Sequence, residues 1–223
     1  MQIELQNLQR NVGITFLLMD MKSKGIDVRP IRQVTGDEEF AEIFLDEVEI
    51  PVENLVGKEN EGWKVAQVTL SSERGLTLVE LTERMALSLW RLGLAATGGT
   101  GDTAALDVSV ARAVVDISAR IEAMRAMLAT LMENRIAGRE AVGDASILKL
   151  AYSRLSRDFT ALGLRLQGFA AMRDTGYVLG AGYETGNWMF DFLNSYQYNI
   201  AGGSNEIQRN IISERVLNMP REK

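Results

Sequence analysis

Apolar positions in the first fifty residues follow the two-residue period of β-strands. A bulky apolar run covers residues 14–19, and alternating segments cover 26–29 and 42–50. Pro30 and Pro51 follow the two alternating segments, as is typical of strand ends or edge strands. The pattern predicts about three strands. Such a sheet is marginal alone, and its edges need partners from a longer chain or another subunit.

After Pro51 the apolar residues recur at the three- and four-residue steps of amphipathic helices. Two long sets keep this spacing: Leu106, Val110, Val114, Ile117, Ile121, Met124, Leu128 and Leu131, and then Leu148, Tyr152, Leu155, Phe159, Leu162 and Leu166. A further long helix is expected from about residue 61 to 95. Because no proline occurs from Val52 to Met219, nothing there breaks long helices. The pattern predicts a mainly α fold, an antiparallel four-helix-type bundle preceded by a few β-strands.

Capping residues mark where two of the helices begin. Asp102 or Thr103 is expected to cap the second long helix. Ser204 or Asn205 is expected to cap a last helix that runs from residue 206 to 217. Long apolar stripes exceed what one subunit of such a bundle buries, so self-association is expected.

Composition narrows the classes of function. The chain has 223 residues, of which 46% are hydrophobic and 24% charged, and these values are ordinary for a soluble globular protein. The net charge of −6 argues against nucleic-acid binding and against an anionic membrane surface. No signal peptide or spanning segment is visible, so a cytoplasmic protein is expected.

Histidine and cysteine are both absent from the sequence. Their absence excludes disulfides, thiolate or imidazole metal sites and Ser-His-Asp hydrolysis, so no metal site is expected. Acid–base chemistry then falls to Asp, Glu, Tyr or Lys.

Two places along the chain are candidates for chemistry. Gly202 and Gly203 run directly into a helix start, where free N–H groups suit a phosphate or pyrophosphate; the alternative is an ordinary helix start with a glycine hinge. Glu73 and Arg74 precede Gly75 inside the first long helix. This pair is either a carboxylate base in a cleft or a solvated ion pair.

Several stretches of the sequence resemble the acyl-CoA dehydrogenase family. Residues 198–217, which read YNIAGGSNEIQRNIISERVL, are similar to the C-terminal signature of that family. Residues 36–51 with 54–57 resemble the end of its middle β-domain. Residues 61–66 and 73–75 resemble the first helix of its C-terminal bundle. The resemblance follows the family in order along nearly the whole chain.

The resemblance implies two domains. Residues 1–57 correspond to late strands of an incomplete middle β-domain, and residues 58–223 correspond to the C-terminal helical bundle domain. Family members also carry an N-terminal helical domain and earlier β-strands, which supply much of the flavin and acyl-CoA contact surface. The chain is therefore expected to be a truncated part of such an enzyme.

The resemblance also implies the reaction and its residues. Family members dehydrogenate an acyl-CoA thioester: a glutamate removes the α-proton while a hydride passes from the β-carbon to N5 of FAD. Many members place this base where Gly202 stands here, and others place it at the position of Glu73, so Glu73 is the expected base and Arg74 is expected to bind substrate. The residues Gly202, Gly203, Ser204 and Glu206 are expected to bind FAD.

Two family motifs do not appear in this sequence. Residues 95–101 do not match the Arg-x-x-Phe-Gly stretch that reaches a neighbouring subunit's flavin, and residues 167–171 fit the Gln-x-x-Gly-Gly-x-Gly stretch poorly. These departures resemble members that work in mixed-subunit tetramers. They leave a non-catalytic partner subunit as an alternative, with an acyl-CoA oxidase as a further one. The expected partners are acyl-CoA, electron-transfer flavoprotein as electron acceptor, and other subunits in a homo- or hetero-oligomer (dimer or tetramer).

Overall fold

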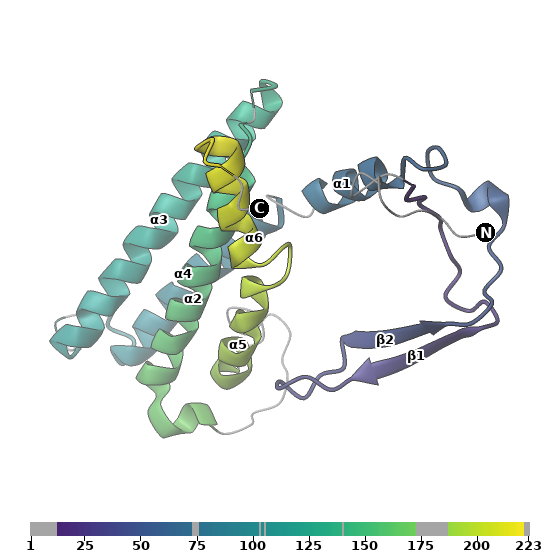
Figure 1. Ribbon diagram of the computed structural model, residues 1–223. Helices are drawn as coiled ribbons and strands as arrows, with labels where there is room; N and C mark the ends of the chain where they lie inside the picture. Colours follow the sequence, from purple (N-terminus) through teal and green to yellow (C-terminus); the bar gives the residue numbers. More distant parts are fainter. Residues whose placement is uncertain are drawn as a thin grey trace. The chain divides into compact units, whose positions relative to one another are not determined.

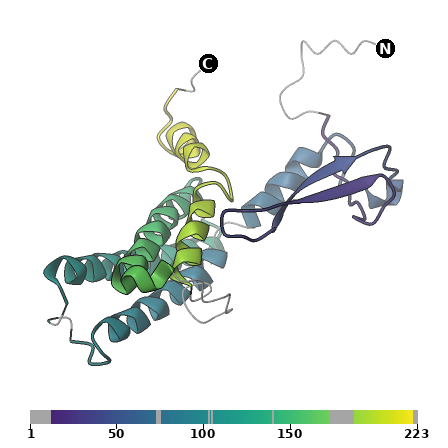
Figure 2. The same ribbon diagram turned by 90° about the horizontal axis from the view of Figure 1, so that it is seen from below.

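The computed structural model describes residues 13–72, 76–102, 104, 106–139, 141–172 and 187–220. The chain divides into two compact units, Met1–Ser72 and Glu73–Lys223. The described part is mainly helical and contains one two-stranded sheet, which confirms the predicted fold class (Figures 1 and 2).

The sheet of the first unit pairs β1 (Ile26–Ile31) with β2 (Phe40–Leu45) in antiparallel register. Pro30 lies within β1 opposite Ala41, and a proline is tolerated there because each strand of a two-stranded sheet is an edge. The Arg29 guanidinium lies 4.3 Å from the centre of the Phe44 ring. The unit also contains η2 (Val52–Asn54) and α1 (Gly62–Ser72).

The run at residues 14–19 does not form the third strand that its composition predicts. It makes two isolated bridges instead, Ile14 with Glu61 and Leu17 with Leu55. Its partner segment contains the 3-10 helix η2 and the turn that leads into α1, so no continuous ladder can form. The second alternating segment was predicted as a strand over residues 42–50, but the strand β2 ends at Leu45.

The second unit is a helical bundle. Its long helices α2 (Leu76–Ala96), α3 (Val108–Ile136) and α4 (Asp144–Gln167) pack along one another, and α5 (Trp188–Ser195) and α6 (Asn205–Ile211) pack against α4 (Figure 1). Three short elements complete the unit: η4 (Gly168–Met172), η5 (Tyr196–Asn199) and η6 (Ile212–Val216), a π-helical turn.

Helix boundaries differ from the predictions at three places. Helix α3 is capped by Asp107, which accepts from the Ser109 N–H at 2.9 Å, rather than by Asp102 or Thr103; Thr103 lies outside the described residues. The predicted last helix is capped by Ser204 but is α-helical only to Ile211. Helix α5 was not predicted, because two turns carry too few positions to reveal a helical period.

Much of the core comes from the two apolar stripes that the sequence predicts, to which α2 adds Leu78, Met85, Leu89 and Leu92. The buried residues of α3 are Ile117, Ile121, Met124, Leu128 and Leu131. In α4, which lies against the other helices of the unit, the predicted positions from Leu148 to Leu162 are buried. Burying such side chains stabilises the fold by roughly 1.5–3 kcal/mol each. Among the described helices, none is long and apolar enough to cross a membrane.

Candidate functional site

The two glycines of the C-terminal motif form a turn before α6, here called the diglycine turn (Ala201–Ser204). Gly202 has φ +65° and Gly203 has φ +94°, a conformation that other residues rarely adopt. A Cβ atom at Gly202 would meet nothing within 4 Å, so the turn requires glycine for its backbone conformation and its open side remains accessible.

Ser204 begins the helix that follows. Its Oγ accepts a hydrogen bond from the Ile207 N–H at 3.3 Å, as an N-cap does. Within the described residues, no acceptor takes the backbone N–H of Gly203 or Ser204. The turn therefore presents donors that suit an anionic or carbonyl oxygen.

A mostly apolar cavity of about 310 Å³ adjoins this turn within the helical bundle. Its lining combines the start of α2, one face of α4, and the chain around the turn: Thr77, Leu78, Leu81, Lys149, Tyr152, Tyr198, Ala201 and Gly202. The fold thus brings the start of α2 to the diglycine turn, although more than a hundred residues separate them in the sequence.

Glu73 and Arg74, the predicted base and substrate-binding residue, lie outside the described residues, as does Gly75. Thr77, which lies four positions after Glu73 in the sequence, lines the cavity. None of the residues that line the cavity in the described structure is a carboxylate. The roles of Glu73 and Arg74 therefore stay predictions.

Glu206 lies in the first turn of α6 with an exposed carboxylate. The carboxylate accepts from Arg209 Nη1 at 3.1 Å. Its pKa is lowered chiefly by a hydrogen bond from its own backbone N–H, assisted by the Ser204 hydroxyl and by Arg209, so the group is ionised at neutral pH. The geometry leaves Glu206 accessible from solvent.

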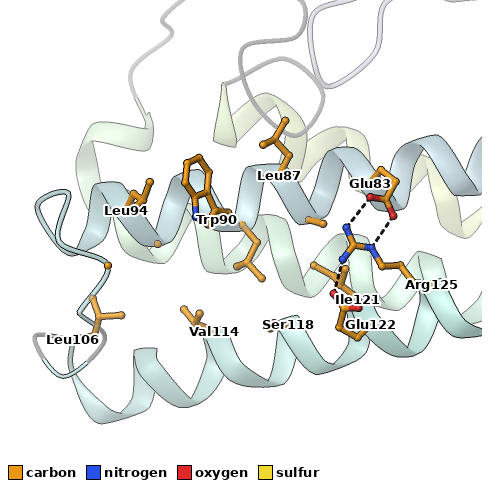
Figure 3. Close-up of a pocket in the computed structure, with 14 residues that line it drawn as sticks. Glu83, Leu87, Trp90, Leu94, Leu106, Val114, Ser118, Ile121, Glu122 and Arg125 are labelled. Carbon is orange, nitrogen blue, oxygen red and sulfur yellow. Dashed lines mark hydrogen bonds and ion pairs between the residues drawn. The ribbon is translucent and has the colours of Figure 1, made fainter.

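A second hollow of about 620 Å³ lies between α2 and α3 (Figure 3). Apolar side chains, including Leu87, Trp90 and Val114, line much of it. At the other end Arg125 donates to both carboxylate oxygens of Glu83, each at 2.7 Å, and to Glu122 at 2.5 Å. None of the predicted site residues lines this hollow.

The Arg125 network was not predicted from the sequence. Glu83 and Arg125 lie 42 positions apart on different helices, and no local spacing signals such a pair. Hydrogen bonds from Arg125 lower the pKa of the Glu83 carboxyl, and the same bonds raise the pKa of Arg125. Since Arg125 donates to both Glu83 and Glu122, the network joins α2 to α3.

Replacing Arg125 by methionine is expected to lower the free energy of unfolding at pH 7 by roughly 0.5–1 kcal/mol, because the partners are partly exposed. The lowered pKa of Glu83 means that this stabilisation is present above the ordinary pKa of a glutamate. It is lost as the pH falls through the folded-state pKa. Urea unfolding of both proteins at pH 7 and at pH 3 measures the difference.

Arg91→Met is the matched control, since Arg91 is exposed on α2 and forms no ion pair with the described residues. It is expected to leave the free energy of unfolding nearly unchanged. An equal loss in both variants, or a loss for Arg125→Met that is the same at both pH values, would contradict the assignment.

No group of three or more acidic residues in the described ranges is arranged to hold a metal ion. The fold is that of a helical bundle domain with a cavity beside the diglycine turn. The family model described as acyl-CoA dehydrogenase, C-terminal domain, matches residues 60–217. The chain therefore belongs to the acyl-CoA dehydrogenase family.

Sequence relatives agree with this assignment, and solved structures share the fold. Acyl-CoA dehydrogenase IpdE1 of Mycolicibacterium smegmatis is 35% identical over 215 residues, which are 96% of this chain and 51% of that protein. The ChsE4–ChsE5 complex from Mycobacterium tuberculosis shares the fold with a TM-score of 0.78 at 22% identity, covering 97% of this chain and 56% of the other. The FAD complex of PigA has a TM-score of 0.78 at 22% identity, with coverage of 93% and 52%. The chain spans about half the length of the IpdE1 proteins of Mycolicibacterium smegmatis and Mycobacterium tuberculosis.

Proposed function

We propose that the chain is the C-terminal part of a flavin-dependent acyl-CoA dehydrogenase that uses Glu73 as its base. The observation that carries the proposal is the cavity that Thr77 and Gly202 share, because it joins the helix that follows Glu73 to the predicted cofactor-binding turn. Membership of an oxidoreductase family supports the same reaction.

The diglycine turn fits a flavin dinucleotide. Gly202 leaves open space beside the backbone, and the N–H groups of Gly203 and Ser204 have no acceptor among the described residues. We assign Gly202, Gly203, Ser204 and Glu206 to FAD binding, with the two N–H groups toward phosphate oxygens and Glu206 toward the sugar side. The FAD complex of PigA, a protein of the same fold, is consistent with this cofactor.

In the proposed reaction Glu73 removes the proton from the α-carbon of an acyl-CoA thioester, and Arg74 orients the substrate. A bound FAD would accept the hydride that leaves the β-carbon. The mostly apolar walls that α2 supplies, Leu78 and Leu81, exclude water from the acyl group. Electron-transfer flavoprotein is the proposed acceptor of the electrons.

Assembly is part of the proposal. Because relatives such as IpdE1 are about twice as long as this chain, we expect a complete flavin and acyl-CoA site to need further protein. We propose that this comes from a longer chain or from other subunits in a dimer or tetramer, and that the enzyme works in the cytoplasm. The ChsE4–ChsE5 structure, a complex of two proteins, is consistent with a mixed assembly.

The test is anaerobic reduction of bound flavin by acyl-CoA. The protein that contains this chain is loaded with FAD, and loss of the oxidised-flavin absorbance is followed after acyl-CoA is added. Reduction is expected in the assembled protein, whereas the 223-residue chain alone is expected to bind FAD weakly and to show no turnover. Failure of any acyl-CoA to reduce the flavin of the assembled protein would overturn the proposal. Tight stoichiometric FAD binding with turnover by the 223-residue chain alone would contradict the expectation that the site needs further protein.

A second candidate function is that of a non-catalytic subunit in a mixed tetramer. It is favoured by the connector after α2, residues 97–101, which carries only Thr and Gly where a flavin-contacting motif is common in the family. Comparing the flavin content of the isolated chain with that of its complex separates the two functions. A catalytic chain is expected to take up flavin on assembly and to lose reduction on substitution of Glu73. A non-catalytic subunit would show neither effect.

A further inference from the structure

The amide of Asn205 joins the end of the diglycine turn to helix α4. Its Oδ1 accepts from Lys149 Nζ at 2.8 Å and from Ser153 Oγ at 3.2 Å, and its Nδ2 donates to Asn199 Oδ1 at 2.9 Å. Lys149 is 8% exposed and Ser153 is fully buried. Loss of a hydrogen bond to a buried ammonium is costly, so these contacts hold residue 205 firmly against α4.

Gln208 holds the turn from the other side. The side chain is fully buried, and its Nε2 donates to the carbonyl oxygens of Gly202 at 2.9 Å and Gly203 at 3.2 Å. Its Oε1 has no hydrogen-bond partner in the described structure. The Gln208 side chain therefore holds the turn through its Nε2 donor alone.

The two contacts of Gln208 determine which way the turn presents its N–H groups. In a trans peptide the C=O and the following N–H point in opposite directions, and the described chain has no cis peptide. The carbonyl of Gly202 shares its peptide with the N–H of Gly203, and the carbonyl of Gly203 shares its peptide with the N–H of Ser204. Because both carbonyls point toward buried Gln208, both N–H groups point away from it.

We infer that Gln208 and Asn205 are positioning residues that fix the diglycine turn with the N–H groups of Gly203 and Ser204 directed outward. The inference rests on the proposed function, in which these N–H groups bind FAD. Gln208 sets the orientation of the two peptides, and Asn205 sets the place of the turn at the wall of the cavity that Lys149 and Gly202 line. Neither side chain needs to touch the cofactor.

The first test is amide hydrogen exchange in the purified 223-residue chain. Gln208→Met keeps an unbranched side chain of similar length without the donor, and Asn205→Leu removes all three contacts of Asn205. Each is expected to speed exchange of the Ile200 and Ala201 amides, which donate to the Gln197 carbonyl at 2.9 and 2.7 Å, by about tenfold or more, the effect of losing one well-made hydrogen bond. Asn205→Asp retains the acceptor for Lys149 and is expected to restore slow exchange.

Asn210→Leu is the matched control, since it makes the same substitution at an exposed position of α6. In this control the Ile200 and Ala201 amides are expected to exchange at the rate of the unaltered chain. Equal exchange in Asn210→Leu, Asn205→Leu and Gln208→Met would overturn the inference. If Gln208→Met fails to fold, the comparison of Asn205→Leu with Asn205→Asp decides it.

The second test measures binding in the assembled, flavin-loaded protein. Asn205→Leu and Gln208→Met are expected to weaken FAD retention by about tenfold or more and to raise KM, with a smaller change in kcat, because the base is untouched. Asn205→Asp is expected to restore both. Faster exchange with FAD retention and KM unchanged would show a purely structural role and overturn the inference. If the unaltered protein holds flavin but is not reduced by acyl-CoA, the proposed function fails while FAD retention still decides the positioning role.

Discussion

Glu73→Gln is expected to abolish reduction of the bound flavin by acyl-CoA in the assembled enzyme while FAD stays bound. Glutamine has nearly the size of glutamate but cannot accept the α-proton. Loss of a general base costs typically 10²–10⁴-fold in rate. Single-turnover reduction followed by flavin absorbance measures the change, and the flavin-to-protein ratio measures retention of the cofactor.

The Glu73→Gln substitution has the largest expected effect because it removes the proposed base. Histidine and cysteine are absent from the chain, and the described lining of the cavity holds no carboxylate. The lining does include Lys149, Tyr152 and Tyr198, so the proposal of Glu73 as the base rests on the resemblance to the family. Glu73 lies four positions before Thr77 in the sequence, and Thr77 lines the cavity.

Glu80→Gln provides the control for this experiment. Glu80 lies on α2 with an exposed side chain, and its carboxylate is 3.7 Å from Arg84 Nη1. It is expected to leave flavin reduction within about twofold of the unaltered rate, as a weak surface ion pair has little effect. Retained turnover in Glu73→Gln would remove Glu73 from the role of base.

Gly163→Ala is expected to destabilise the bundle by roughly 1–3 kcal/mol, the usual range for overpacking. A Cβ atom at Gly163 would lie 2.0 Å from Cε3 of Trp188, so either α4 or α5 must shift. Trp188 is nearly buried and packs edge-on against the Phe159 ring with 5.3 Å between ring centres, which leaves the indole little room.

Gly93→Ala is a control with the opposite expected sign. Gly93 lies in the interior of α2, and a Cβ atom there would meet nothing within 4 Å. The substitution is expected to stabilise the chain by about 0.5–1 kcal/mol, because alanine favours a helix over glycine. Urea unfolding of the unaltered chain, Gly163→Ala and Gly93→Ala measures the sign of each change in the free energy of unfolding. A stabilising Gly163→Ala would show that α5 does not pack as closely as the structure has it.

Local periodicity explains why much of the fold can be predicted. The stripe from Leu148 to Leu162 is buried because residues three and four apart share one face of a helix, and this relation is present in the sequence itself. The short helix α5 and the missing third strand were not predictable in this way. The first is too short to show a period, and the second depends on whether a distant segment can pair with it.

The sequence by itself determined the helical bundle, a helix start after Gly202 and Gly203 capped by Ser204 or Asn205, and the family to which the chain belongs. Each of these depends on residues close together along the chain, or on motifs that occur in order. Only the tertiary structure decided that Gly202 and Thr77 line one cavity, that Lys149 and Ser153 hold Asn205, and that Arg125 joins Glu83. Such partners lie on different elements of the fold, and no spacing within one helix determines which other segment packs against it.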